Sequence, residues 1–221
     1  VIPEVVRSLP ELRTQALQEF LMPSHCPICG SIAEADEGEA VVRCSGGLSC
    51  SAQHKESVRH FASRKAMDID GLGEKIIDQL LESRLIETVA DLYHLNAEVL
   101  SALDRLGEKS ANNLIAAIDR SRKTTLPRFL FALGIREVGE VTARNLAQHF
   151  SDLAPLMAAD IDTLMGVPDV GPTVAKHVHT FFHQPRNLDV ISSLIDHGIQ
   201  WERVAAATDG PQPLQGKTFV V

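Results

Sequence analysis

The sequence predicts a mainly α-helical chain in which a small four-cysteine element precedes an all-α domain of four repeated helical hairpins. Three observations predict this arrangement. All four cysteines lie between positions 26 and 50, a glycine-containing turn recurs four times, and apolar residues follow each turn at helical spacing. A chain of 221 residues is long enough to bury cores of this kind.

The cysteines form two closely spaced pairs, Cys26-x2-Cys29 and Cys44-x5-Cys50, within the stretch CPICGSIAEADEGEAVVRCSGGLSC. Two thiolate pairs joined by a short hairpin can complete a tetrahedral Zn2+ shell, and four sulfur ligands leave no open position for catalysis. The alternative is two disulfides, which would suit a secreted protein, but nothing in the sequence suggests secretion. We therefore expect residues 26–50 to form a structural zinc finger.

A turn pattern recurs at nearly constant intervals along the rest of the chain. In each copy an apolar residue, two variable residues and another apolar residue precede a glycine, and a helical apolar pattern follows. The aligned glycines are Gly73, Gly107, Gly139 and Gly171, separated by 34, 32 and 32 residues. Such spacing indicates an internal repeat.

Each copy resembles the helix-hairpin-helix motif, in which a tight glycine turn joins two short helices. Glycine permits the positive φ that the turn needs and lets the backbone approach a ligand closely. Free N–H groups and the dipole at the start of the second helix favour an anion there, such as a phosphate of the DNA backbone. The candidate DNA-binding residues are Gly71, Gly73, Lys75, Gly107, Lys109, Ser110, Gly139, Arg144, Gly171 and Thr173.

The four copies differ in how closely they match the motif. Only the first has both glycines, because Arg105, Glu137 and Asp169 replace the first glycine in the others. Lys75 and Lys109 occupy the same position in copies 1 and 2, whereas the acidic residues of copies 3 and 4 would repel a phosphate. A single hairpin could equally serve packing alone. Four in register favour DNA contact by at least two of them, strongest at copy 1 and then copy 2.

Two basic segments accompany the repeats. A helix expected over residues 54–69 carries Lys55, Arg59, Arg64 and Lys65. This flank is able to follow a phosphate backbone, but an ordinary solvated face explains it equally well. The second basic segment contains Arg122, Lys123 and Arg128, with Arg120 just ahead of it.

Charge and motif content limit the possible functions. The formal net charge is −8, and residues 51–150 hold 14 basic and 14 acidic residues, so composition alone does not support nucleic-acid binding, which is possible only through local patches or backbone amides. No apolar run approaches the ~20 residues of a membrane helix. There is no P-loop, dinucleotide fingerprint, Ser/His/Asp arrangement or K-x-D-G element, so we expect no active site in this chain.

Both ends of the sequence favour a segment of a longer polypeptide. The chain opens on Val1, and VIPEVV at residues 1–6 is strand-like, while residues 7–25 have the composition of a linker with some helical character. Residues 205–215 are rich in Ala, Pro and Gly and predict a second linker. GKTFVV at residues 216–221 then predicts the first strand of another domain.

In the order of its parts, the chain resembles the C-terminal half of a bacterial NAD-dependent DNA ligase. The stretches HKESVRHFASRKAMDIDGLGEKIIDQL and RFLFALGIREVGEVTARNLAQHF are particularly similar to that family, and the resemblance covers essentially the whole chain. It implies the end of an OB-fold barrel at residues 1–6, a zinc finger at 26–50, a tandem helix-hairpin-helix domain at 51–204 and the truncated start of a BRCT domain at 216–221.

The resemblance also implies a function. Enzymes of this family seal nicks in duplex DNA during replication and repair: they adenylate a lysine using NAD, pass AMP to the 5′-phosphate and join the 3′-hydroxyl with the help of Mg2+. The residues for these steps belong to other domains. The chain would therefore be inactive alone, would bind structural zinc but not NAD or Mg2+, and would clamp nicked DNA through sequence-independent contacts. The resemblance also implies that the remaining ligase domains act with this segment in cis. It further implies a monomeric protein that is located in the bacterial cytoplasm and does not bind a membrane.

Two other interpretations stay open from the residues alone. The first is a different helix-hairpin-helix module of a DNA repair protein. The second is a protein-interaction scaffold stabilised by zinc, which the overall acidity favours. Salt-dependent DNA binding would separate the scaffold from the ligase segment and from the other helix-hairpin-helix module, because phosphate contacts release counterions.

Overall fold

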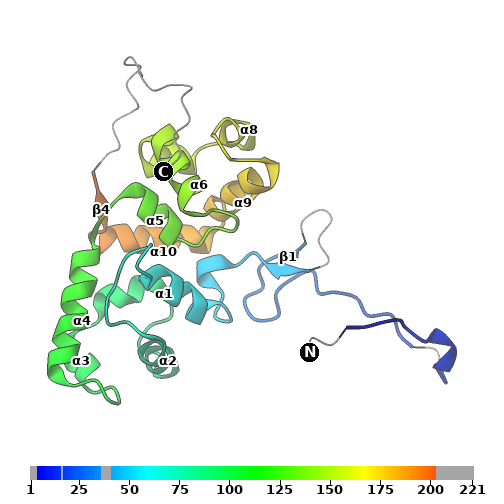
Figure 1. The fold of residues 1–221 in the computed structure, drawn as a ribbon, viewed down its shortest axis with the longest axis horizontal. Helices are drawn as coiled ribbons and strands as arrows, with labels where there is room; N and C mark the ends of the chain where they lie inside the picture. Colours follow the sequence, from blue (N-terminus) through cyan, green and yellow to red (C-terminus); the bar gives the residue numbers. More distant parts are fainter. Residues whose placement is uncertain (1–3, 16, 36–40, 203–221) are drawn as a thin grey trace, which may run out of the picture.

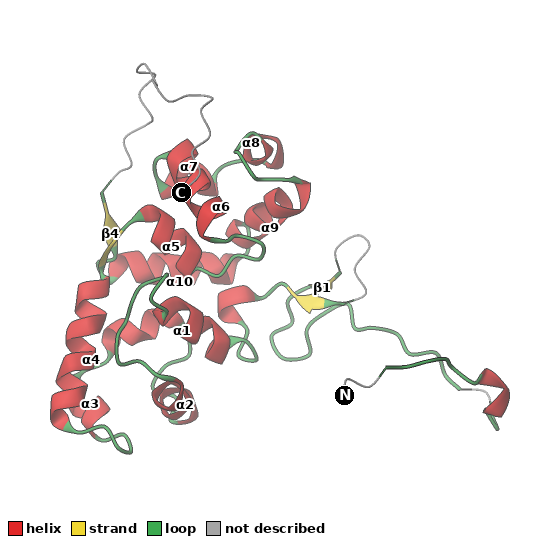
Figure 2. Ribbon diagram, in the orientation of Figure 1, coloured by secondary structure: helices red, strands yellow, loops and turns green. Residues whose placement is uncertain are grey.

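The computed structural model describes residues 4–15, 17–35 and 41–202. The described part is mainly helical, which confirms the expected fold class (Figures 1 and 2). In chain order its α-helices are α1 (His54–Ala62), α2 (Glu74–Glu82), α3 (Ala97–Ser101), α4 (Glu108–Ser121), α5 (Leu126–Ala132), α6 (Glu140–Phe150), α7 (Leu153–Met157), α8 (Ile161–Met165), α9 (Pro172–Phe182) and α10 (Pro185–Asp196). The 3-10 helices are η1 (Pro10–Leu12), η2 (Gly47–Ser49) and η3 (Val89–His94).

The strands are short and form two separate pairs. β1 (Ala33–Glu34) and β2 (Arg43–Cys44) are antiparallel, with Ala33 opposite Cys44. β3 (Lys123–Thr124) and β4 (Gln200–Trp201) are parallel, with Thr124 opposite Trp201. The second pair joins the C-terminal end of the described chain to its middle.

Four helix pairs form the repeated hairpins: α1 packs on α2, α3 on α4, α5 on α6 and α8 on α9. The apolar positions after each glycine turn supply the buried faces, as in Ile77 and Leu80 of α2 and Leu114 and Ile118 of α4. This spacing places the side chains on one stripe of each helix. The four hairpins share one continuous apolar core.

The helix expected over residues 54–69 is wrong in its length. α1 ends at Ala62, and Ser63 has an extended backbone. The chain then folds into a tight turn in which the N–H of Ala66 donates to the carbonyl of Ser63 at 2.9 Å. Arg128 of α5 donates to the carbonyl of Ala66 at 2.8 Å, which satisfies that oxygen from another element. This turn, which a contact distant in sequence supports, replaces the last part of the expected helix.

Helix α10 ties the N-terminal finger to the hairpins. It packs against η2, η3 and α9, and it crosses the middle of the molecule in Figure 1. Val190, Ile191 and Leu194 bury its apolar face. Asn187, which is 0% exposed, donates to the carbonyl of Phe181 at 3.2 Å. The finger and the helical domain therefore share a packed interface.

The ends expected from the sequence are only partly described. Residues 4–6 form no strand, and of residues 7–25 the structure describes η1 and an otherwise irregular, largely exposed path. The expected linker at 205–215 and the expected strand at 216–221 lie outside the described residues. Among the described helices, none has the length and apolar character needed to cross a bilayer.

Candidate metal centre and nucleic-acid interface

The four cysteines converge on one point. Their sulfur atoms all lie within 4.8 Å of one another, with 3.4 Å between Cys29 and Cys44 and 4.0 Å between Cys26 and Cys50. Zn–S bonds of about 2.3 Å in a tetrahedron place the sulfurs about 3.8 Å apart. None of the four forms a disulfide. The donor set and its spacing fit a closed, four-thiolate zinc shell.

Short backbone turns aim the first two sulfurs inward. The N–H of Cys26 donates to the carbonyl of Ser31 at 2.7 Å, and the N–H of Gly30 donates back to Cys26 at 2.9 Å. Gly30 has a φ of +73°, which closes this turn. Cys44 ends β2, and Cys50 directly precedes the turn into α1. Two separate loops therefore supply one cysteine pair each.

Gly46 is a glycine because the sulfurs leave no space beside it. A Cβ at this position would lie 2.8 Å from the Sγ of Cys29, 3.0 Å from the Oγ of Ser31 and 3.1 Å from the Sγ of Cys44. Its own N–H donates to the Sγ of Cys44 at 3.2 Å. The finger thus depends on a close backbone approach that the cysteine spacing alone does not indicate.

The thiols differ sharply in how easily they ionise. Burial opposes ionisation of Cys29, but hydrogen bonds from Ser31 and the neighbouring thiols lower its pKa to about 6. Burial raises the pKa of Cys44 to about 12. Four thiolates this close repel one another unless a cation lies between them, and a divalent metal ion supplies that charge.

The four repeated turns have the same backbone. In each, the N–H of the apolar residue before the aligned glycine donates to the carbonyl three residues earlier, from 3.0 Å at Val138 to 3.4 Å at Leu72. The residue two before the glycine has a positive φ in every copy: Gly71 (+87°), Arg105 (+62°), Glu137 (+60°) and Asp169 (+61°). Copies 2 to 4 therefore keep the turn although they lack the first glycine.

The aligned glycines are not the residues that give the turn its positive φ. Gly73, Gly107, Gly139 and Gly171 all have extended backbones, and each begins the following helix at its N-cap. Nothing lies within 4 Å of a Cβ built at any of the four. Neither backbone strain nor internal packing requires glycine here, so what remains is room for something outside the chain.

The helices that follow these glycines begin without side-chain caps. A glycine N-cap has no side chain that can accept from the first N–H groups. The first backbone bond in each helix returns to the glycine carbonyl, as from the N–H of Ile76 to Gly73 at 3.0 Å. Earlier N–H groups thus face solvent with the positive end of the helix dipole. This is a suitable site for an anion.

Lysines neutralise the acidic residues that begin two of these helices. Lys55 pairs with Glu74 at 2.9 Å, and Lys65 pairs with Glu140 at 2.6 Å. In the described part of the chain, the exposed Lys75 makes no ion pair. Lys55 and Lys65 therefore cancel charge beside the turns, while Lys75 stays available to a ligand.

The other predicted DNA-binding side chains are also exposed. Lys109 and Ser110 lie in the first turn of α4, Arg144 lies near the start of α6, and Thr173 lies at the start of α9. The pair between Lys65 and Glu140 places the start of α6 beside hairpin 1. The cations of the second basic segment differ in their contacts. Arg122 and Arg128 donate to backbone carbonyls inside the protein.

A repeated amide contact, which the sequence reasoning missed, joins the hairpins in pairs. Gln79 of α2 donates to the carbonyl of Asp104 at 3.2 Å and accepts from its N–H at 2.7 Å. Asn145 of α6 donates to the carbonyl of Pro168 and to the carboxylate of Asp169, both at 3.0 Å. Each amide comes six residues after its own aligned glycine and contacts the turn of the next hairpin. The signal in the sequence is an amide at the same repeat position.

Removing this contact is expected to loosen the first hairpin pair. Gln79→Met keeps the length of the side chain but loses both hydrogen bonds to Asp104, so we expect unfolding to become easier by about 1 kcal/mol. Urea denaturation followed by circular dichroism measures this change. The control is Gln148→Met, on an exposed face of α6. Equal stability of the two variants would show that the amide contact contributes nothing.

The comparisons with known families divide the chain as the geometry does. A family model described as NAD-dependent DNA ligase C4 zinc finger domain matches residues 25–52. A SAM-like Helix-hairpin-helix tandem matches residues 63–120, and a Helix-hairpin-helix motif matches residues 128–191. The fold and its sites define a zinc-finger protein with two tandem helix-hairpin-helix pairs, each spanned by one amide contact.

Proteins similar to the whole chain share one name. Proteins named DNA ligase from Methylococcus capsulatus, Marinobacter nauticus and Shewanella frigidimarina are 58%, 53% and 51% identical over all 221 residues. The chain spans 33%, about a third, of the length of each of these curated relatives. These matches support a C-terminal segment of an NAD-dependent DNA ligase, and its four-cysteine element matches the zinc finger of that family.

Proposed function

We propose that this chain is the part of an NAD-dependent DNA ligase that clamps nicked duplex DNA through its phosphate backbone. The observation that carries the proposal is the set of four helices that begin at uncapped glycines with open space above them. Free N–H groups at a helix N-terminus bind phosphate without contacting a base. This mode of binding explains how a chain with a net charge of −8 engages DNA.

In this proposal the zinc finger is a structural support. Four sulfur ligands leave the metal no open coordination position, so zinc supplies no chemistry on the DNA. Its role is to hold the finger against α10, where Arg186 donates to the carbonyl of Cys29 at 3.1 Å. Cys26, Cys29, Cys44 and Cys50 are the proposed ligands, and residues 26–50 and 51–204 the proposed boundaries of the finger and the hairpin domain.

The sealing reaction belongs to the full ligase. NAD, Mg2+ and the adenylated lysine would act in domains joined to this chain in cis, so we expect the chain alone to be inactive. We also propose that the enzyme works as a monomer in the bacterial cytoplasm, in replication and repair. Bacterial relatives named DNA ligase support this assignment.

Titration of the chain onto a labelled nicked duplex at several salt concentrations tests the proposal. Phosphate contacts release counterions, so log K is expected to fall linearly with log salt, by about 0.9 for each contact. An intact duplex of the same sequence is the control, and tighter binding to the nicked duplex is expected. A flat slope would contradict DNA binding by the hairpins and favour a protein-interaction scaffold.

A further inference from the structure

A hollow of about 350 Å3 lies between the turn after α1 and the segment that joins α4 to α5. Its walls come from two stretches far apart in sequence. The lining residues are Met67, Asp68, Arg120, Ser121, Lys123, Thr124, Thr125 and Arg128. None of them belongs to the four glycine turns.

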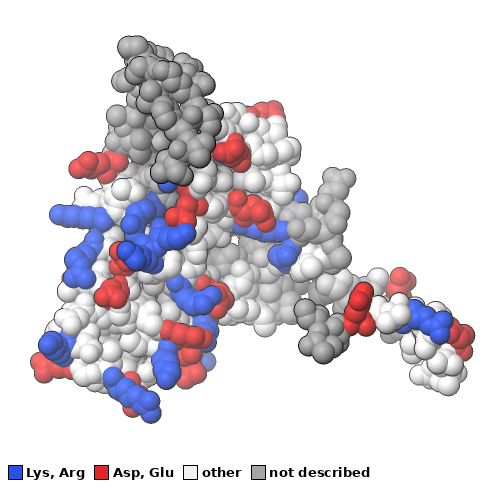
Figure 3. Space-filling model, in the orientation of Figure 1, with Lys and Arg blue, Asp and Glu red and all other residues white. Residues whose placement is uncertain are grey.

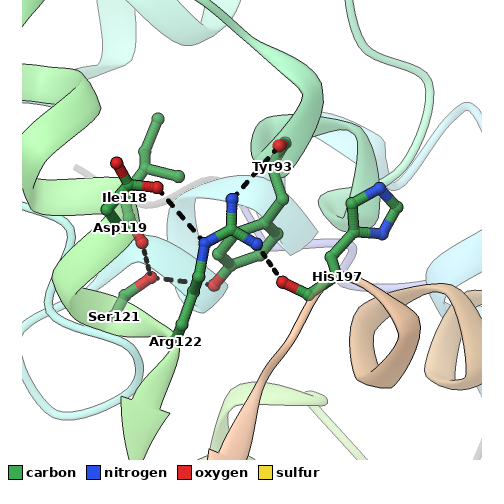
Figure 4. Close-up of polar contacts among 6 residues, drawn as sticks. All are labelled: Tyr93, Ile118, Asp119, Ser121, Arg122 and His197. Carbon is green, nitrogen blue, oxygen red and sulfur yellow. Dashed lines mark hydrogen bonds and ion pairs between the residues drawn. The ribbon is translucent and has the colours of Figure 1, made fainter.

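Ser121 and Arg122, which lie between Arg120 and Lys123 in the sequence, are held by contacts inside the protein (Figure 4). The guanidinium of Arg122 donates to the carbonyls of Tyr93 and His197, pairs with Asp119 at 3.2 Å and lies 4.9 Å from the centre of the Tyr93 ring. The hydroxyls of Ser121 and Tyr93 lie 2.8 Å apart, in a hydrogen bond. Pairing of β3 with β4 fixes the backbone further. The residues on either side of Ser121 and Arg122 are therefore held in place before any ligand binds.

Arg120 and Lys123 flank this anchor and face outward. Both are exposed, and neither makes an ion pair or side-chain hydrogen bond within the described residues. Arg128, the third cation that lines the hollow, instead donates to the backbone carbonyls of Ala66 and Arg64. Arg120 and Lys123 are thus available to a ligand on a rigid support.

The charges that face the hollow favour an anion. Arg120, Lys123 and Arg128 line it together with one carboxylate, Asp68, which leaves an excess of two positive charges. Arg128 also braces the wall, because it donates to the carbonyl of Arg64 at 2.8 Å. In Figure 3, Lys and Arg side chains gather where α4 meets β4 and beside α5.

The hollow continues to the first glycine turn. Arg120 also lines an adjoining hollow of about 440 Å3 with Gly71 and Ser110. Asp68 lines a third, of about 560 Å3, with Gly71 and Gly73. A track thus leads from the start of α2 to β3. Arg64 and Asp70 also line the adjoining hollows, so the whole track keeps an excess of two positive charges. Such an extended site suits a polymer with anionic groups better than a single small ion.

We propose that Arg120 and Lys123 form an additional phosphate-binding site, which takes the DNA backbone as it leaves the turn of hairpin 1. The proposal rests on the proposed function, since it extends the same DNA path. It adds side-chain contacts to the backbone contacts of the glycine turns. The footprint of the chain on DNA is therefore longer than the four turns alone would give.

The double variant Arg120→Gln/Lys123→Gln tests the proposal in the salt titration on nicked duplex. Loss of two phosphate contacts is expected to make the slope of log K against log salt shallower by about 2 and to weaken binding about tenfold at moderate salt. The control is Arg13→Gln/Arg84→Gln, which removes the same charge from exposed positions in the N-terminal segment and at the far end of α2. Unchanged circular dichroism would exclude a folding defect.

The outcomes separate this site from the proposed function. If the double variant behaves like its control while Gly73→Asp/Lys75→Glu weakens binding, the hairpins bind DNA and Arg120 and Lys123 are only a solvated surface. If neither variant weakens binding, the proposed function itself fails. A shallower slope in Arg120→Gln/Lys123→Gln alone among charge-matched variants supports the additional site.

Discussion

Removal of zinc is expected to unfold residues 25–50 while most of the helical domain keeps its structure. The finger has two-residue strands and little core of its own, with Leu48 and Cys50 among its few buried side chains. Structural zinc in small domains supplies roughly 10–16 kcal/mol of binding free energy, which is then folding free energy. The helices bury their apolar faces against one another and depend less on the metal.

Metal content and thermal unfolding measure this effect. The purified chain is expected to release one zinc ion to a strong chelator, and its thermal midpoint to fall, with little loss of helical circular dichroism. Cys44→Ser is expected to lower the thermal midpoint in the same way. Gly46→Ala is expected to lower it less, because the added methyl would crowd the sulfurs of Cys29 and Cys44. Ser51→Ala, at an exposed position, is the control. An unchanged midpoint after zinc release would contradict a structural role.

The variant Gly73→Asp/Lys75→Glu is expected to weaken binding to nicked duplex by tenfold or more, to about a hundredfold at low salt. Gly73 has an extended backbone with open space around it, so Asp fits there without strain. Aspartate is also a favourable N-cap, so α2 should stay intact or gain stability. Its carboxylate would accept from the same N–H groups that a phosphate needs, and a glutamate in place of Lys75 would replace attraction with repulsion.

A charge-matched control makes this result specific. Ser83→Asp/Arg84→Glu adds the same negative charge at the opposite end of α2, away from the turn. Zinc content and helical circular dichroism should be equal in both variants. The assignment of hairpin 1 to DNA would be lost if the two variants bound nicked duplex with the same affinity as the unchanged chain.

Local patterns predicted the elements of this fold well, because their causes lie within a few residues. The pair spacing of Cys26, Cys29, Cys44 and Cys50 foretold a single cluster, and the intervals between the glycines foretold four hairpins. The predicted helix over residues 54–69 was too long, because the chain turns after Ser63, and Arg128 of α5 supports that turn through the carbonyl of Ala66. Sequence periodicity carries no information about such a distant partner.

The candidate DNA-binding surface, too, could be predicted from the sequence only in part. The sequence showed four aligned glycines. It did not show that these glycines are N-caps with extended backbones and open space around them. The basic segments could be found too, but not which cations are engaged. Arg122 holds the carbonyls of Tyr93 and His197, while its neighbours Arg120 and Lys123 face solvent. Neighbours in sequence thus have opposite roles, set by what packs beside them.

The sequence by itself determined the zinc-binding cysteines, the number of hairpins and the apolar face of each helix, since spacing along the chain specifies these features. The tertiary structure alone decided how the hairpins pair through Gln79 and Asn145, where α1 ends and which cations remain available to a ligand. Each of these depends on contacts between residues many positions apart, and such contacts form only when the helices pack around their common core.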